Sequence, residues 1–313
     1  MAPTAAAPTP PWARPPDGLA LAQAQALAQA QAQAQAQARN EDLTLLQSLL
    51  PAPVLAAQAW IDDRTDWPGQ CEAERIRMAR ATPARRAEHA AGRWCARQAL
   101  HALADRLDPP APDGSPVAPP GPSAGTDDTP HRSRPRSAVR DDEGAAWARQ
   151  WRSVTDLPAA ADRQPLWPAG CRGSIAHDAG LALAVVADAR GCAALGVDVE
   201  RRDRLLDPDR LSALILTPSE RLAHDALAEP AARALRLLQT WCAKEAVFKA
   251  WHPATGRWLE PRDIELCQWP QTSAGTFIAR LPATASGQPL AGRLAWNARR
   301  CVALVHRAAR TGA

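Results

Sequence analysis

The sequence lacks several features that would place it in other protein classes. It has no tyrosine, and its seven cysteines form no CxxC pair and no spacing typical of Cys/His metal ligands. We therefore expect reduced, mostly buried thiols. No apolar run approaches the roughly 20 residues of a membrane span, and the N-terminus lacks the charged and apolar regions of a signal peptide. We expect a cytoplasmic protein with no membrane partner.

Net charge is small, and lysine is nearly absent. A formal charge of +4 gives no global basic field that would point to nucleic acid, so an anion site has to be built locally from the many arginines, and we expect no nucleic-acid partner. Of the 37 basic residues, only Lys244 and Lys249 are lysines. A guanidinium does not replace an ammonium group that acts as a compact point charge or proton donor. This distribution favours a functional role for the two lysines.

What the chain does contain is enough apolar sequence for a folded core, interrupted by two biased regions. Apolar residues make up 46% of the 313 positions, and there are 30 prolines. Residues 1–40 are rich in Ala, Gln and Pro and are expected to form a disordered N-terminal extension. Residues of about 109–155 are expected to be a disordered insertion. The insertion lies within an N-terminal lobe of residues 41–187, and a C-terminal lobe covers residues 188–313.

Hydrophobic periodicity and turn residues predict the main elements of the fold. Thr82-Pro83 opens a helix that continues to Leu103, and Thr217-Pro218 opens another. A second long helix is predicted over 231–251. The expected strands are 173–177 and 181–187, which form a hairpin, followed by 194–200, 276–281, 293–297 and 301–306. The order of helix, strands, helix and strands indicates an α+β fold with two similar lobes.

Two carboxylates in Gly196-Val-Asp-Val-Glu200 form the first candidate site. Asp198 and Glu200 are two residues apart on a predicted strand, so both project from one face while the valines enter the core. Neighbouring carboxylates repel unless a cation lies between them, and Mg²⁺ fits a site with oxygen ligands alone. The alternative is a solvated strand end that pairs with Arg201 and Arg202.

The predicted helix that contains Trp241-Cys-Ala-Lys-Glu-Ala-Val-Phe-Lys-Ala250 forms the second candidate site. Glu245 and Lys249 are four residues apart and share a helix face. Such a pair is usually a surface salt bridge of little consequence. The rarity of lysine in this chain is what favours function here.

Three further basic residues are weak candidates when each is taken alone. His177 ends a hairpin strand, where a structural histidine is the ordinary alternative. Arg85 and Arg93 lie on roughly the same side of their helix and could hold phosphate groups, although a solvated basic face is the ordinary alternative.

The combination and order of these motifs resemble the Sfp-type 4′-phosphopantetheinyl transferases, closest to the branch that contains the enterobactin synthase component. The resemblance covers about residues 50–108 and 155–308. Several ordered blocks make it more specific than any single motif. The blocks are Arg85-Arg-Ala-Glu-His-Ala-Ala-Gly-Arg93, Arg163-Gln-Pro-Leu-Trp-Pro168, Gly173-Ser-Ile-Ala-His177, Gly196-Val-Asp-Val-Glu200, Leu216-Thr-Pro-Ser-Glu220, Trp241-Cys-Ala-Lys-Glu-Ala-Val-Phe-Lys-Ala250 and Gly256-Arg-Trp-Leu259.

The resemblance implies a fold and a reaction. The fold is pseudo-twofold α+β with two lobes, each a small antiparallel sheet packed on a helix, and the C-terminal lobe carries the metal site and the catalytic helix. Coenzyme A is expected in the cleft between the lobes. The implied enzyme is a holo-[acyl-carrier-protein] synthase that transfers 4′-phosphopantetheine to a serine of an apo acyl or peptidyl carrier protein and releases 3′,5′-ADP. It requires Mg²⁺ and acts as a monomer.

The family's functional residues fall on positions of this chain that match its motifs. Glu245 would take the proton from the carrier serine, and Lys249 would neutralise charge on the departing 3′,5′-ADP. The implied magnesium ligands are Asp198, Glu200 and Glu245. The implied coenzyme A contacts are Arg85, Arg93, Arg163, Ala176, His177, Asp198, Lys244, Glu245 and Lys249.

The sequence departs from the family pattern at two positions beside the motif histidine. Ala176 replaces the usual Ser or Thr, so only its backbone could contact a ligand. Asp178 adds a carboxylate near the expected phosphate site.

Two other classes of function are compatible with parts of the sequence. One is another Mg²⁺-dependent phosphoryl transferase or hydrolase built on the same carboxylates, which would leave the two lysines and the His177 hairpin unexplained. The other is a catalytically inert coenzyme-A-binding or interaction protein on the same scaffold. The sequence leaves open whether the acceptor serves fatty-acid, polyketide, siderophore or other nonribosomal-peptide synthesis, because acceptor choice depends on surface shape.

Overall fold

A computed structural model describes residues 18–61, 67–68, 71–109, 136–178, 180–203, 208–282 and 288–309. The chain divides into two compact units, residues 1–44 and 45–313, and each is described by itself. Among the helices within the described ranges, none is both long and apolar enough to cross a membrane.

The first unit contains most of helix α1, Gly18–Gln47. The side chains of residues 23–37 are exposed, as expected for an Ala-Gln repeat without an apolar face. The expectation that residues 1–40 are disordered is therefore wrong for residues 18–40, while residues 1–17 lie outside the described residues. Alanine and glutamine both favour the helix, and 30 residues are long enough to offset the cost of nucleation.

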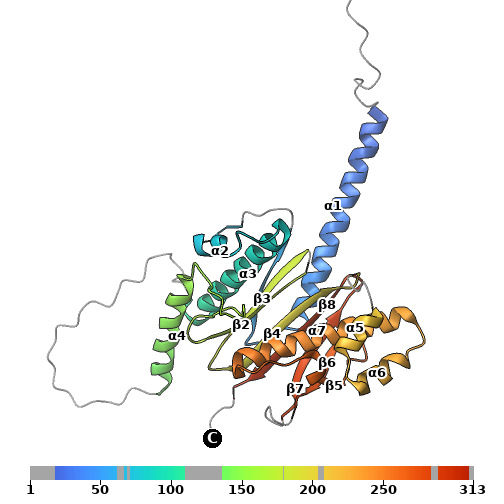
Figure 1. Ribbon diagram of the computed structural model, residues 1–313. Helices are drawn as coiled ribbons and strands as arrows, with labels where there is room; N and C mark the ends of the chain where they lie inside the picture. The colour runs from blue at the N-terminus through green and yellow to red at the C-terminus, as the bar shows by residue number, and fades with distance from the viewer. Residues whose placement is uncertain are drawn as a thin grey trace, which may run out of the picture. The chain divides into compact units, whose positions relative to one another are not determined.

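The second unit contains two antiparallel sheets and the helices that cover them (Figure 1). The strand order is β1-β3-β2 in one sheet and β4-β8-β7-β6-β5 in the other. In chain order the elements are β1 Leu55–Trp60, α2 Glu72–Arg77, α3 Pro83–Leu107, α4 Arg136–Arg152, β2 Cys171–His177, β3 Leu181–Asp188, β4 Cys192–Arg201, α5 Pro208–Ile215, α6 Pro218–Asp225, α7 Pro230–Thr255, the 3₁₀ turn Pro261–Asp263, β5 Glu265–Gln268, β6 Ala274–Arg280, β7 Leu290–Trp296 and β8 Arg300–Ala308.

The core of this unit is layered as helix, sheet, sheet and helix. Alternate residues of β3 point to opposite sides, so Leu183 and Val185 pack toward the second sheet while Ala184 and Val186 pack on α3. Helix α7 packs on the outer face of the five-stranded sheet. The sheets also meet at a polar contact, where the Val197 amide donates to Ser174 Oγ at 3.1 Å. This arrangement confirms the α+β fold with a sheet packed on a helix in each lobe.

Most predicted elements are present, and their boundaries have physical causes. The Thr82 side chain accepts a hydrogen bond from the Arg85 amide at the start of α3. Thr217 and Glu220 form a reciprocal capping box at the start of α6. Strands β1 and β5 were not predicted from the sequence. The lobe boundary near residue 187 stays a prediction.

Helix α4 corrects the expectation of a disordered insertion over residues 109–155. Residues 136–152 form this helix, and Trp151 is fully buried with its Nε1 donating to the Ala169 carbonyl at 3.0 Å. Arg152 adds ion pairs of 3.0 Å to Asp105 and Asp108 at the end of α3. Tertiary packing of a few apolar residues thus holds a segment whose composition is polar. Residues 110–135 lie outside the described residues.

A glycine brings α7 close to β4. A Cβ atom built on Gly196 would lie 2.1 Å from the Ala246 carbonyl oxygen and 2.5 Å from the Ala250 amide nitrogen. Only glycine permits this approach. Because side chains alternate along a strand, Asp198 and Glu200 share the Gly196 side of β4 and lie against the helix.

Candidate functional site

The carboxylates of β4 lie beneath α7, largely shielded from solvent. Asp198 is 5% exposed and Glu200 is 8% exposed, while Val197 and Val199 are in the core on the opposite face. In the sheet, Asp198 is opposite Ala303 of β8, and Glu200 is opposite Cys301. The predicted alternation of this strand is therefore correct, but its carboxylates are not at a solvated strand end.

Lys249 contacts one of these carboxylates directly. Its Nζ lies 2.6 Å from Asp198 Oδ1. Burial raises the pKa of Asp198 to about 6; repulsion by Glu245 adds to this rise, and Lys249 opposes it. Burial would lower the pKa of Lys249, but attraction to Asp198 and Glu245 raises it above the ordinary value. Lys249 is therefore a cation placed between the carboxylates and the neighbouring pocket.

Glu245 and Glu200 complete the acidic cluster. The Trp241 indole, one turn before Glu245 on α7, donates to Glu200 Oε1 at 2.8 Å. Burial raises the pKa of Glu245, Lys249 opposes the rise, and Glu200 adds to it. The mutual repulsion of the carboxylates indicates that a cation would stabilise this cluster.

The carboxylate oxygens of Asp198, Glu200 and Glu245 are the type of ligand that a hard cation prefers. Asp198 Oδ2 is buried and makes no hydrogen bond to a described residue, so one oxygen is available as a ligand. Within the described ranges, the single group of three candidate ligands whose atoms all lie within 4.8 Å of one another is Cys71, Glu74 and Asp156, in the other lobe. Asp198, Glu200 and Glu245 are therefore less tightly converged than a bound metal would require.

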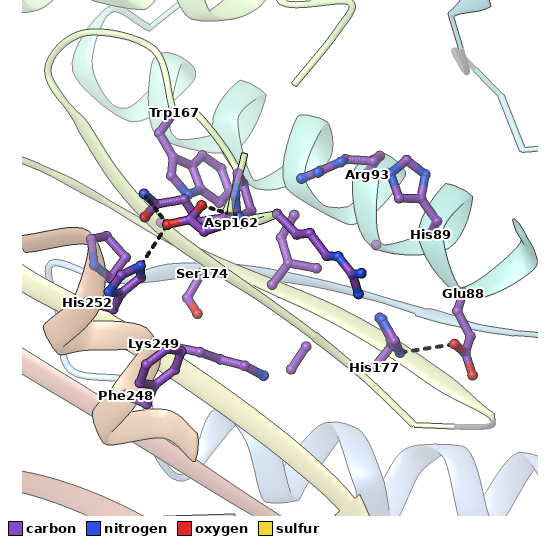
Figure 2. A pocket seen from close by; sticks show the side chains of 18 of the residues that line it. Glu88, His89, Arg93, Asp162, Trp167, Ser174, His177, Phe248, Lys249 and His252 are labelled. Atoms are coloured by element: carbon purple, nitrogen blue, oxygen red, sulfur yellow. Dashed lines mark hydrogen bonds and ion pairs between the residues drawn. The ribbon is translucent and has the colours of Figure 1, made fainter. Parts of the chain in front are cut away.

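A pocket of about 370 Å³ lies beside Lys249, and its walls come from both predicted lobes (Figure 2). Volumes of this size enclose most of a drug-sized ligand. Sequence-predicted residues form its basic wall, namely Arg85, Arg93, Arg163, His177 and Lys249, and Ala176 also lines it. These residues come from α3, the segment before β2, β2 itself and α7.

The hydrogen bonds of His177 define its protonation state. Arg85 Nη1 lies 3.0 Å from His177 Nε2, and because a guanidinium only donates, Nε2 must accept. The proton of the neutral ring is then on Nδ1, which faces Glu88 Oε2 at 3.5 Å (Figure 2). Burial lowers the pKa of His177 to about 4. Glu88 also accepts from Arg85 Nη1 at 3.0 Å, so it partly neutralises this end of the pocket.

Arg93 lies deeper in the pocket wall. It is 5% exposed, and its buried Nε makes no hydrogen bond to a described residue. On the next turn of α3, Arg97 forms a buried ion pair with Glu74 at 3.0 Å. Burial lowers the pKa of Arg93, although attraction to Glu74 and Asp156 opposes this shift. An anion in the pocket would give the Arg93 guanidinium a charged hydrogen-bond acceptor.

Lys244 does not belong to the pocket, which corrects its expected role in coenzyme A binding. Its side chain is 1% exposed, and Nζ donates to Glu220 Oε2 at 2.6 Å and to the Ile215 carbonyl at 2.8 Å. Glu220 also accepts from the Thr217 and Leu266 amides. Lys244 therefore holds α6 and β5 against α7 and has a structural role.

The two departures beside His177 have separate outcomes. Ala176 is buried in the pocket wall and offers no side-chain hydrogen bond. Asp178 turns away from the basic residues, since it accepts from the Gly180 and Leu181 amides at 2.8 Å and from Arg300 Nε at 2.6 Å. Its carboxylate therefore has partners of its own, and Asp178 does not line the pocket.

For several residues that line the pocket, the sequence predicted no role in the site. They are Glu88, Asp162, Phe248, His252 and Trp258. Glu88 is three residues from Arg85, and His252 is three residues from Lys249, so helical spacing from the predicted residues could have identified both. Asp162 precedes Arg163, but its contact with His252, 90 residues away, carries no local signal.

Family models match both halves of the second unit. Residues 194–296 match the model described as "4′-phosphopantetheinyl transferase superfamily". Residues 72–124 and 144–187 match the "4′-phosphopantetheinyl transferase N-terminal domain".

Individual relatives carry related names. The chain is 30% identical over 254 residues to 4′-phosphopantetheinyl transferase PptT of Mycobacterium tuberculosis, which covers 79% of this chain and 89% of that protein. It is 45% identical over 119 residues to 4′-phosphopantetheinyl transferase Svp of Streptomyces mobaraensis, covering 37% of this chain and 46% of Svp. It is 37% identical over 130 residues to enterobactin synthase component D of Salmonella typhi, covering 39% and 53%. The latter two alignments thus span about half of each relative.

Proposed function

The chain belongs to the 4′-phosphopantetheinyl transferase superfamily, and on this premise we propose that it transfers the 4′-phosphopantetheine arm of coenzyme A to a serine of an apo carrier protein. The observation that carries the proposal is the position of Lys249, which lines the basic pocket and contacts Asp198 of the acidic cluster at 2.6 Å. A phosphate-binding wall and a carboxylate cluster thus meet at one side chain. This arrangement suits transfer at a pyrophosphate.

The basic wall supports binding of the nucleotide end of coenzyme A. Arg85, Arg93, Arg163 and His177 would hold its phosphate groups, including the 3′-phosphate. Arg85 would exchange its contacts with Glu88 and His177 for phosphate oxygens, so binding includes the cost of breaking them.

Asp198, Glu200 and Glu245 would hold Mg²⁺ once their side chains converge further, and the ion would supply electrostatic stabilisation of phosphate oxygens when bound. The unbonded, buried Asp198 Oδ2 and the elevated pKa of Glu245 support this assignment. The ligand set contains oxygen atoms alone, as magnesium prefers.

The proposed reaction uses two residues of α7. Glu245, directly or through water, takes the proton from the carrier serine hydroxyl while its oxygen forms a bond to the phosphorus next to pantetheine. The bond between that phosphorus and the bridging oxygen breaks, and 3′,5′-ADP leaves with the electron pair. Lys249 stabilises the negative charge that grows on the leaving group.

Replacing the carboxylates tests this assignment. Asp198→Ala and Glu245→Gln should each reduce transfer by about 100-fold or more, since each removes charge from the reacting centre. Transfer is measured as the mass gain of an apo carrier protein incubated with coenzyme A and Mg²⁺. Asp188→Asn, at the end of β3 and outside the pocket, is the matched control and should retain full activity. Parent-level transfer by Asp198→Ala at limiting Mg²⁺ would refute the metal assignment.

The alternatives differ in their products. A phosphoryl hydrolase would release 3′,5′-ADP without adding mass to the carrier, and an inert coenzyme-A-binding protein would release nothing. The acceptor is an acyl or peptidyl carrier protein, and the relatives named for enterobactin synthesis make a siderophore peptidyl carrier a natural first substrate to test. A monomer is the expected active form because both pocket walls come from one chain.

A further inference from the structure

Asp162 and His252 form a hydrogen-bonded ion pair across the pocket, and none of the sequence motifs contains both residues. Asp162 Oδ2 lies 2.7 Å from His252 Nε2, as Figure 2 shows. Asp162 is in the segment before β2, and His252 is on α7 one turn after Lys249. Both line the pocket, so the contact joins its two walls.

The contacts of His252 define a cationic ring. Its Nδ1 lies 3.1 Å from the Arg257 carbonyl oxygen, which only accepts, so Nδ1 carries a proton. Its Nε2 faces the Asp162 carboxylate, which also accepts when ionised. Partial burial would lower the pKa of His252, but hydrogen bonds to Asp162 and Arg257 raise it. The hydrogen bond to His252 also lowers the pKa of Asp162.

Neighbouring aromatic rings fix the orientation of His252. Its ring stacks on Phe248 with centroids 5.2 Å apart and an angle of 7° between the planes. Trp258 presents an edge to the same ring at 5.6 Å. The His252 side chain is 11% exposed, so it is a rigid anchor rather than a mobile surface group.

Asp162 uses its other oxygen to organise the turn that carries Arg163. Asp162 Oδ1 accepts from the Gln164 amide at 3.2 Å, while the Ala160 amide donates to the Gln164 carbonyl at 2.9 Å. Arg163 has φ of +72°, a left-handed conformation that costs a non-glycine residue about 1 kcal/mol or more. Such a conformation persists where its surroundings enforce it.

We propose that Asp162 and His252 are positioning residues that fix the Arg163 turn against α7, so that Arg163 is held ready for the nucleotide end of coenzyme A. This inference rests on the proposed function. Neither residue is required to touch the reacting phosphorus, and their effect is transmitted through Arg163. The pair therefore governs affinity for the nucleotide, and Glu245 and Lys249 govern the rate of transfer.

Binding of 3′,5′-ADP, measured by calorimetry, tests the inference without requiring turnover. We expect His252→Asn to raise the Kd for 3′,5′-ADP by about fivefold or more. Without the contact to Asp162, the turn that carries Arg163 is no longer held in place and must be ordered when the nucleotide binds. The KM for coenzyme A should rise in parallel, while kcat stays within about twofold. Asp162→Asn provides a second, nearly isosteric variant if His252→Asn fails to fold.

A mutant cycle with Arg163→Ala distinguishes positioning from a general structural effect. In the Arg163→Ala background, His252→Asn should change the Kd by less than about twofold, because the residue that it positions is already gone. His306→Asn, on β8 and outside the pocket, is the matched control and should leave the Kd unchanged.

The outcomes separate this inference from the proposed function. The positioning role would be overturned if His252→Asn raised the Kd for 3′,5′-ADP by the same factor with and without the Arg163 side chain. It would also be overturned if His252→Asn and Asp162→Asn each left this Kd unchanged. Failure of the unaltered protein to bind either 3′,5′-ADP or coenzyme A would overturn the proposed function and this inference with it.

Discussion

The close contact between Gly196 and α7 makes Gly196→Ala a sharp test of how the fold builds the site. The new Cβ would meet the Ala246 carbonyl oxygen at 2.1 Å, and ordinary contact begins at 3.4 Å. Because the neighbours are backbone atoms, α7 has to move away from β4 by about 1.3 Å. This shift would separate Glu245 and Lys249 from the carboxylates of β4.

The expected magnitude follows from that displacement. Overpacking of this kind costs about 1–3 kcal/mol of unfolding free energy. A misplacement of about 1 Å in a catalytic arrangement can cost about 100-fold in rate. We therefore expect kcat for carrier modification to fall by far more than the loss of folded protein explains.

The assay compares kcat with the folded fraction from thermal denaturation. Gly191→Ala is the matched control, because its added Cβ would have one neighbour, the Asp188 carbonyl oxygen at 3.9 Å, and should be tolerated. If Gly196→Ala has the parent melting temperature and the parent kcat, then α7 does not depend on this glycine for its position.

Four further perturbations have distinct outcomes. Lys249→Arg should lower kcat by about tenfold or more, because a broad guanidinium replaces a compact ammonium beside Asp198; full activity in a transfer assay would contradict this. Lys244→Met should cost about 3–5 kcal/mol in chemical denaturation, because it leaves Glu220 buried without its cation, while the folded protein keeps its coenzyme A affinity. Trp151→Ala should destabilise the protein by about 3–5 kcal/mol, whereas exposed Gln150→Ala should not, and equal stabilities would argue against the packing of α4. Burial lowers the pKa of His89 to about 4, so the unfolded chain binds more protons below pH 6.5, and stability should fall as the pH falls from about 6.5 to 4; His89→Gln should reduce that slope in denaturation curves recorded across this range.

The sequence predicts the elements whose pattern is local. The Thr-Pro starts of α3 and α6, the hairpin of β2 and β3, and the alternation of β4 all follow from neighbouring residues, and each is present. Helix α4 is different, since its stability depends on Trp151 packing against α3 rather than on its composition. No local pattern carries that information.

The two lysines show the same limit within the site. At about 100° per residue, Lys244 and Lys249 are five positions and about 140° apart around the helix, so both cannot face one pocket. Helical geometry could thus have separated them, but it could not say which one faces the carboxylates. Packing decides this, because Gly196 places β4 against the Ala246 and Ala250 side of α7.

The site contacts between distant segments are the least predictable part. The basic wall combines α3, the turn at Arg163 and α7, and the Asp162–His252 contact exists only because the lobes are packed together. The motif residues Arg85, Arg93, Arg163, His177 and Lys249 do meet in one pocket, as the resemblance implies. Their individual roles stay predictions.

The most direct measurement of the central claim follows both products of one reaction. The protein is incubated with coenzyme A, Mg²⁺ and an apo carrier protein, and the intact mass of the carrier and the amount of released 3′,5′-ADP are recorded over time. The proposed transfer predicts that each carrier gains one phosphopantetheine arm for each 3′,5′-ADP released. Release of 3′,5′-ADP without a mass gain, or no release with several apo carriers while coenzyme A binds, would contradict it.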